Sequence, residues 1–124
     1  MHPGNLLIAE LGVIKLGDFG LTTPLEHSCS QRDTDHPASR YMAPEVREGK
    51  PELKSDVWSL GISLVEMAEG KDALDGCIMN DAPSLSSSDY SPTFVDFVSK
   101  CLVKDAKERW SVKQLMEVRR FTRE

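Results

Sequence analysis

The sequence lacks the features that mark membrane, nucleic-acid-binding and disulfide-rich proteins. No apolar run is long enough to cross a bilayer, and residues 1–10 have no basic stretch before an apolar one, so we expect no signal peptide. With 15 Lys and Arg against 20 Asp and Glu, the net charge of −5 argues against nucleic-acid or anionic-membrane partners. The scattered Cys29, Cys77 and Cys101 fit no metal or disulfide spacing, so we expect a reducing, cytoplasmic setting.

The remaining composition is that of an ordinary globular domain. A chain of 124 residues suits one domain with a real core, and no internal repeat is visible. The only strong charge asymmetry is at the end, where residues 100–124 hold 8 basic and 4 acidic residues. We interpret that basic end as a solvated helical face.

The stretch Ser55–Gly70 is predicted to be the central helix. Ser55 is a suitable N-cap, Asp56 suits the first turn, and Gly70 is a suitable stop. Apolar residues cover most of the circumference, and the polar ones form one narrow stripe. A helix of this kind is normally buried, so the sequence alone predicts a core helix.

Two short apolar runs near the start predict a β-hairpin. They are 6–8 and 13–16, joined by a connection that contains glycine. In an antiparallel hairpin, Asn5 before the first run and Asp18 after the second meet at the open end. Their oxygens suit Mg²⁺ that takes its other ligands from water and phosphates, although Asn and Asp are also common turn residues.

The rest of the chain is predicted to be a long loop and several helices. Residues 21–39 are polar and aperiodic, and they carry six hydroxyl side chains. A short helix is expected before Gly49, and a second one within 72–79. Two further helices are expected at 92–103 and 111–118, the first opened by Ser-Pro and the second by a capping box. The predicted fold class is therefore α+β, mainly helical with one hairpin.

Four motifs in order resemble the C-terminal lobe of the protein kinases, from residue 2 to about residue 117. A single motif would be weak evidence, but four at plausible spacings are specific. They are Asp18-Phe19-Gly20, Ala43-Pro44-Glu45, the run Ser55–Gly61 and Glu108-Arg109. The resemblance implies a partial kinase domain over 1–124, with an activation segment at 18–45, the central helix at 55–70, and no N-lobe.

The same resemblance implies a role for each matching residue. Asn5 and Asp18 would hold Mg²⁺ and ATP, with Phe19 packed behind the site and Gly20 allowing the turn. Glu45 and Arg109 would form a buried ion pair that joins the end of the activation segment to the lobe. Asp56 would accept hydrogen bonds from the catalytic-loop backbone.

Within the kinases, the sequence is most similar to MAP kinase kinases. The segments SRYMAPE, SLVEMAEGK and SPTFVDFVSKCLVKDAKER carry this likeness. It implies phosphate transfer to Ser or Thr, with Tyr as a further acceptor, on a protein substrate such as a MAP kinase. It also implies that an upstream kinase phosphorylates Ser30 and Thr34, although hydroxyl residues are common in any loop.

The departures from the family pattern lie around the phosphate-transfer site. The catalytic-loop Asp would precede residue 1, and the Gly-rich loop and the strand Lys are absent. His2 stands at the usual Lys position, Ala38 at a usual Thr, and Trp110 at a usual Pro. The sequence 118–121 replaces the usual His-Pro-Phe.

Three hypotheses follow for the chain. It is a piece of a working kinase, a pseudokinase that binds partners, or a relic lobe. We favour the first for family identity and expect the chain by itself to be inactive. We also expect Trp58, Leu64 or Val65 to face water as an apolar patch, because helices that cover them in the family are absent.

Overall fold

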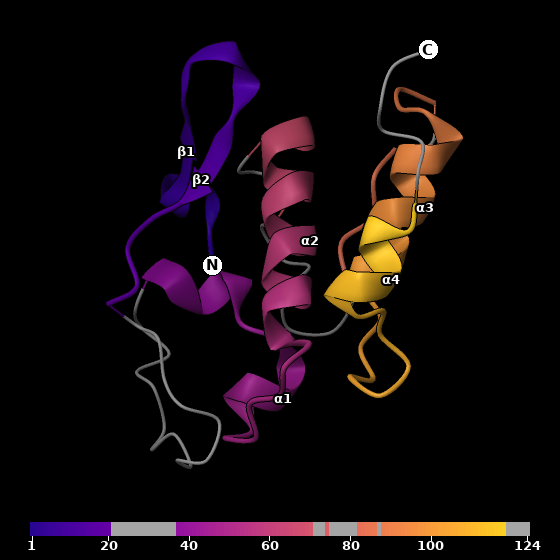
Figure 1. The fold of residues 1–124 in the computed structure, drawn as a ribbon. Coiled ribbons are helices and arrows are strands. Elements are labelled where there is room, and N and C mark those ends of the chain that lie inside the picture. The colour runs from indigo at the N-terminus through magenta and orange to yellow at the C-terminus, as the bar shows by residue number, and fades with distance from the viewer. Residues whose placement is uncertain (21–36, 71–73, 75–81, 87, 119–124) are drawn as a thin grey trace.

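The computed structural model describes residues 1–20, 37–70, 74, 82–86 and 88–118, and within them the fold is α+β. A two-stranded antiparallel sheet is followed by four α-helices (Figure 1). The strands are β1 (Leu6–Ile8) and β2 (Ile14–Leu16). The helices are α1 (Pro44–Arg47), α2 (Ser55–Glu69), α3 (Pro92–Cys101) and α4 (Val112–Met116). In Figure 1, α2 stands between the hairpin and α3.

Helix α2 has the predicted extent but not the predicted cap. It ends before Gly70, whose φ of 93° is the left-handed conformation that glycine adopts without strain. At the other end, Lys54 is the cap residue and makes no side-chain cap bond, so the prediction of Ser55 as N-cap was wrong. The Ser55 hydroxyl instead donates to Glu45 Oε1 at 2.7 Å and accepts from the Glu52 backbone N–H at 2.9 Å.

The polar stripe of α2 is buried rather than solvated over most of its length. Ser59, Ser63 and Glu66 are all buried, whereas Asp56 is exposed. The Ser63 hydroxyl donates to the Ser59 carbonyl at 2.7 Å, and the Ser59 hydroxyl donates to the Tyr41 carbonyl at 2.8 Å. Because each buried hydroxyl has a partner, these polar side chains sit in the interior without a large desolvation cost.

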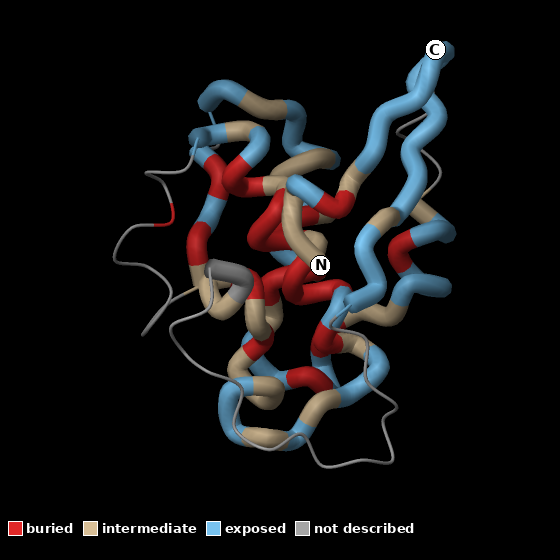
Figure 2. Tube along the Cα trace, turned by 90° about the vertical axis from the view of Figure 1, so that its left-hand side faces the viewer, coloured by how far each residue is buried: buried red, intermediate tan, exposed pale blue. Residues whose placement is uncertain are grey.

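The core gathers along α2, as the red segments of Figure 2 show. Trp58 and Val65 belong to it, so the predicted exposed patch at these residues was wrong. The turn at 37–41 and helix α3 both contact α2, and residues from both elements belong to the same cluster. The main cluster is Tyr41, Ala43, Trp58, Ile62, Val65, Leu74, Leu85, Val98 and Leu102.

Gly61 sets the close approach between α2 and α3. A Cβ at this position would lie 2.7 Å from Leu102 Cδ2 and 2.8 Å from Cys101 Cβ, which is closer than carbon atoms tolerate. Cys101 itself is fully buried beside Val57 and Leu115. Burial raises the pKa of its thiol to about 12 despite the nearby Arg109.

The hairpin forms as predicted, with Leu6 paired to Leu16 and Ile8 to Ile14, although Val13 lies outside the second strand. Its apolar side chains are largely exposed. Leu11, at the tip, is fully exposed and has a φ of 65°. The exposed apolar residues on this element are Leu7, Ile8, Leu11, Val13, Ile14 and Leu16. Six of the eleven exposed large apolar residues in the described part of the chain therefore lie on the hairpin, against one, Met67, on α2.

The last two helices begin as predicted and are shorter than predicted. The Ser91 hydroxyl accepts from the Phe94 N–H at 3.3 Å, and Ser111 forms the expected capping box with Gln114. Helix α3 ends at Cys101 rather than 103, and α4 ends at Met116 rather than 118. The predicted short helix before Gly49 is α1, while the one expected within 72–79 lies outside the described residues, Leu74 excepted.

Candidate functional site

Asn5 and Asp18 meet at the open end of the hairpin. The Asn5 Nδ2 donates to the Gly17 carbonyl at 3.0 Å and to the Asp18 carbonyl at 3.3 Å. The Gly17 N–H donates back to the Asn5 carbonyl at 2.8 Å. The strand pairing thus brings together two residues that are 13 positions apart, which is the arrangement that the hairpin geometry predicts.

The two side-chain hydrogen bonds of Asn5 are both made by its amide nitrogen. Among the described residues, none donates to the amide oxygen. The two backbone carbonyls therefore fix the orientation of the buried amide, and the oxygen is the atom that could act as a ligand.

Asp18 is exposed, and the conformation of its own backbone sets the direction of its side chain. Its φ of 54° lies in the left-handed region, which Asp tolerates better than most residues. The Gly20 N–H donates to Asp18 Oδ1 at 3.2 Å, a local turn typical of Asp. A Cβ on Gly20 would lie 3.2 Å from the same oxygen, so glycine gives this turn room. A second carboxylate oxygen remains for a cation.

The two side chains carry one amide oxygen and one carboxylate, which are the hard ligands that Mg²⁺ prefers. Over the described ranges, no group of three or more His, Cys, Asp or Glu forms a complete metal cage. A cation at this end of the hairpin therefore needs further ligands from a bound molecule.

Phe19 does not pack behind this pair within the described part of the chain. Its side chain is 68% exposed, although the family resemblance predicts a packed position. The hairpin offers no covered surface next to it, because the apolar side chains of both strands also face solvent. Phe19 therefore adds to the apolar surface of the hairpin.

His2 packs on Tyr41. The two ring centroids are 5.6 Å apart and the rings are inclined by 34°. His2 is three residues before Asn5, and the Asn5 N–H donates to the His2 carbonyl at 2.9 Å. The residue that replaces the family's Lys is thus in contact with a core aromatic side chain.

Tyr41 is bonded to α2 through both its hydroxyl and its backbone carbonyl. Its hydroxyl donates to Glu66 Oε2, and its carbonyl accepts from the Ser59 hydroxyl. Burial and the Glu66 carboxylate raise the pKa of Tyr41 to about 12, against the opposing charge of Arg40. These two bonds join the 3₁₀ turn Pro37–Tyr41 to the middle of the central helix.

The predicted ion pair between Glu45 and Arg109 is present, although 64 positions separate the residues. Arg109 Nη1 and Nη2 lie 2.7 Å and 3.0 Å from the two Glu45 oxygens, a bidentate arrangement. The remaining Arg109 N–H groups donate to the carbonyls of Val103, Lys54 and Lys104. All five donors of a fully buried guanidinium are therefore paired.

The surroundings of the ion pair keep Glu45 ionised. Burial alone would raise the pKa of Glu45, but the hydrogen bonds from Arg109 and Ser55 outweigh it, so the pKa lies below its ordinary value. The Arg109 guanidinium also lies 5.2 Å from the ring centroid of Trp58. The pair thus joins α1, α2 and the turn before α4 at one buried point.

The predicted role of Asp56 and the predicted phosphorylation of Ser30 and Thr34 stay predictions. Asp56 is exposed and forms no hydrogen bond with residues 1–5, so the contact to catalytic-loop backbone stays a prediction. Ser30 and Thr34 lie outside the described residues, and Ala38 lies in the 3₁₀ turn Pro37–Tyr41.

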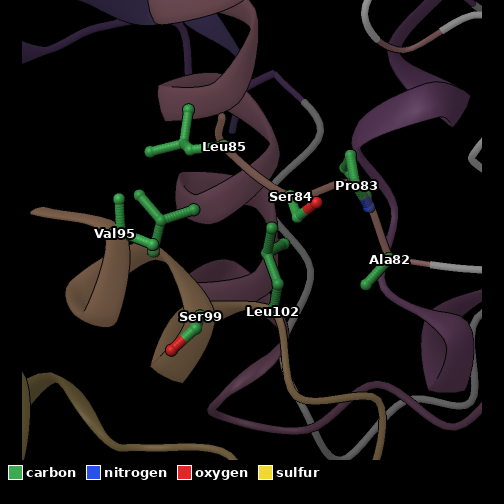
Figure 3. A pocket seen from close by; sticks show the side chains of 8 residues that line it. Ala82, Pro83, Ser84, Leu85, Val95, Ser99 and Leu102 are labelled. Atoms are coloured by element: carbon green, nitrogen blue, oxygen red, sulfur yellow. The ribbon is translucent and has the colours of Figure 1, made fainter. Parts of the chain in front are cut away.

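A small apolar cavity of about 210 Å³ lies elsewhere, between residues 82–85 and helix α3 (Figure 3). The side chains that line it are Ala82, Pro83, Ser84, Leu85, Val95, Val98, Ser99 and Leu102. None of them is charged, and none is a predicted site residue. The cavity is too small for a nucleotide and lacks groups that would bind phosphate.

A protein kinase domain model matches residues 1–121. The chain belongs to the protein kinase family. Serine/threonine-protein kinase dst1 of Dictyostelium discoideum is 40% identical over 91% of this chain. Mitogen-activated protein kinase kinase 1c of Physcomitrium patens and mitogen-activated protein kinase kinase 2 of Arabidopsis thaliana are 39% and 34% identical, each over 94% of it. The chain spans only 17%, 39% and 37% of these three relatives, respectively.

Sequence reasoning missed the hydrogen bond from Tyr41 to Glu66 and the ring contact between Tyr41 and His2. Glu66 offered a signal, because a carboxylate in the polar stripe of a buried helix needs a buried donor. Tyr41 stands in the segment that resembles MAP kinase kinases, and that resemblance does not predict which residues Tyr41 contacts.

No described helix is long and apolar enough to cross a membrane.

Proposed function

We propose that the chain is the C-terminal lobe portion of a MAP kinase kinase-like protein kinase. The whole protein would transfer the γ-phosphate of ATP to a hydroxyl of a protein substrate, a MAP kinase, in a cytoplasmic signalling cascade. The observation that carries this proposal is the pairing of Asn5 with Asp18 at the open end of the hairpin, in a chain of the kinase family. The similarity to two named MAP kinase kinases supports the narrower assignment.

In this proposal each residue has one task. The Asn5 oxygen and the Asp18 carboxylate would hold Mg²⁺, and Mg-ATP would supply the phosphoryl group. Gly20 permits the turn that aims Asp18. Glu45 and Arg109 fix the end of the activation segment at 18–45 against the rest of the lobe. By the family resemblance, the proton acceptor would stand upstream of residue 1, so the roles proposed for these residues are metal binding and architecture.

A scaffold or pseudokinase role is the second candidate. His2 and Ala38 replace residues that contact the transferred phosphate in the family. The packing of His2 on Tyr41 favours this candidate, because a ring held in that contact offers no flexible cation to a phosphate. The transcript sequence upstream of Met1 distinguishes the candidates: an Asp in the catalytic loop supports the enzyme, a changed residue supports the pseudokinase, and a stop codon supports a relic.

The first experiment concerns activity of the isolated chain. Purified chain is incubated with Mg-ATP and a MAP kinase substrate, with Asp18→Ala as control. We expect no phosphate incorporation above the control, because the chain lacks the proton acceptor and the Gly-rich loop. Incorporation that depends on Asp18 would show that the chain is competent alone.

The second experiment tests the cation pair without relying on activity. Mn²⁺ with ADP is titrated into labelled chain, and paramagnetic broadening is followed by NMR. We expect broadening centred on Asn5 and Asp18 that disappears in Asp18→Asn, since the amide removes the charge and keeps the shape. Glu10→Gln, in the hairpin connection, is the matched control and should leave the broadening unchanged. Broadening that survives Asp18→Asn would reject the site.

Regulation by an upstream kinase is the third part of the proposal. Ser30 and Thr34 resemble the activating pair of MAP kinase kinases, and two phosphates would add roughly −3 to −4 charges to the segment. Phosphopeptide mapping of the whole protein from stimulated cells should find both residues, and the Ser30→Ala/Thr34→Ala variant should lose activation. Phosphate found only on Thr22 or Ser28 would remove the support for this pair.

A further inference from the structure

We propose that His2 is a positioning residue, whose ring packs on Tyr41 and thereby fixes the segment that carries Asn5 against helix α2. Position 2 would then supply an aromatic ring, and not the charge that the family's Lys supplies. The coupling itself is independent of any kinase activity. The inference that this coupling positions Asn5 as a cation ligand rests on the proposed function.

The first step of the argument is that Tyr41 is a fixed surface. Its hydroxyl donates to Glu66 and its carbonyl accepts from Ser59, both on α2, and its side chain is buried. Because the hydroxyl and the backbone carbonyl of Tyr41 are both bonded to one helix, the ring cannot turn away from its neighbours without breaking the buried hydrogen bond to Glu66. Whatever packs on this ring is therefore held relative to α2.

The second step is that His2 packs there, with centroids 5.6 Å apart. This spacing lies within the range of about 4.5–7 Å that favourable aromatic pairs show, and the two rings are inclined by 34°. The His2 ring also lies over its own turn, since a Cβ on Gly4 would be 3.0 Å from His2 Cε1. Gly4 thus leaves space for the ring to lie flat against the turn while it contacts Tyr41.

The third step connects His2 to Asn5. The Asn5 N–H donates to the His2 carbonyl, which closes the 3₁₀ turn Pro3–Asn5, and this turn lies against α2. The Asn5 amide then reaches the carbonyls of Gly17 and Asp18. A continuous path of contacts therefore runs from α2 through Tyr41 and His2 to the end of the hairpin, without any contribution from a charge on His2.

The wild-type chain gives the first test by NMR. The His2 ring protons should be shifted upfield by the Tyr41 ring, and Tyr41→Leu should abolish that shift. Random-coil ring shifts in the wild-type chain would overturn the proposal at once. This measurement uses no nucleotide or cation, so its failure is distinguishable from failure of the Mn²⁺ experiment.

Variants at position 2 give the decisive test. His2→Phe keeps a ring and loses the ionisable group, whereas His2→Lys restores the family residue and His2→Ala removes both. We expect His2→Phe to match wild type, and the other two to lower the thermal midpoint by about 2–5 °C. Exchange of the Asn5 side-chain amide should become about 3- to 10-fold faster in those two variants.

A cycle with Tyr41 and one control completes the design. In a Tyr41→Leu background, His2→Ala should no longer change the Asn5 exchange rate, because the partner ring is already gone. Leu11→Ala, at the fully exposed tip of the hairpin, should leave that rate at the wild-type value. The proposal is wrong if His2→Lys equals wild type, or if the effects of His2→Ala are the same in both backgrounds.

Discussion

The surroundings of α2 and the hairpin differ in how far their side chains are buried. Around α2, the polar residues Ser59, Ser63 and Glu66 are buried and hydrogen-bonded, and all five donors of the buried Arg109 have partners. On the hairpin, the apolar side chains are exposed, and only the backbone ladder and the Asn5 amide hold the end together. Two strands without a covered face are marginal by themselves. The comparison teaches that, within the described residues, α2 has its apolar side chains covered by other elements, whereas most apolar side chains of the hairpin face solvent.

The largest effect should come from breaking the buried ion pair. Glu45→Ala leaves the Arg109 charge buried without its counterion and should cost about 3–5 kcal/mol of unfolding free energy. Urea unfolding measures this, and Glu48→Ala, exposed just after α1, should cost less than about 0.5 kcal/mol. In a double-mutant cycle with Arg109→Ala, additive effects would contradict a direct interaction.

A smaller loss should follow from Gly61→Ala. Ala is a better helix former than Gly by about 0.5–1 kcal/mol, so propensity alone predicts a gain. The new methyl group would collide with Cys101 and Leu102 on the facing helix, and overpacking costs about 1–3 kcal/mol. We therefore expect a net lower thermal midpoint. Met67→Ala, at an exposed position of the same helix, is the control, and a rise in the Gly61→Ala midpoint would show that α3 can move away.

The next effect is confined to alkaline pH. The folded-state pKa of Tyr41 is raised from 10.0 to about 12, so the folded state holds this proton more tightly than the unfolded chain does. Its contribution to stability is complete below pH 10 and is lost as the pH rises toward about 12. Tyr41→Phe should remove this part of the alkaline slope. Spectrophotometric titration of Tyr90→Phe follows Tyr41 alone, and a midpoint near 10 would refute the raised pKa.

The smallest effect on stability should come from the hairpin. Ile8→Thr with Ile14→Thr keeps β-branched side chains in a cross-strand pair and removes exposed apolar surface. We expect the free energy of unfolding in urea to stay within about 0.5 kcal/mol of the wild-type value, while aggregation followed by light scattering decreases. Val57→Thr, a buried counterpart, should cost about 1–3 kcal/mol. Unfolding of the chain by the hairpin substitutions would mean that this surface is packed after all.

Sequence reasoning succeeded where the determinant is local or is repeated along the chain. The ends of α2, the hairpin strands and the capping box at Ser111 each depend on a few neighbouring residues. The contact between Glu45 and Arg109 was predictable for another reason. Both belong to motifs of the kinase resemblance, and each would be a costly buried charge alone.

The failures concern partners that come from elsewhere in the fold. Ser55 was expected to cap α2, but its hydroxyl is bonded to Glu45 and to the Glu52 backbone, and no local pattern reveals that competition. Trp58 was expected to be exposed because the family covers it with other helices, whereas Tyr41 and α3 cover it here. The contact of His2 with Tyr41 depends on a turn 39 positions away, so neither periodicity nor motif could predict it.

The reactivity of the buried Cys101 thiol reports when the helices around it separate. A thiol that is fully buried, with its pKa raised to about 12, is nearly inert until α2 and α3 separate. If Cys29 and Cys77 are replaced by Ser, and the reagent is concentrated enough for labelling to outpace reclosing, the rate of labelling at Cys101 becomes the rate at which the helices part. The same residue that fills the space beside Gly61 thus reports, in seconds or hours, how long that space stays closed.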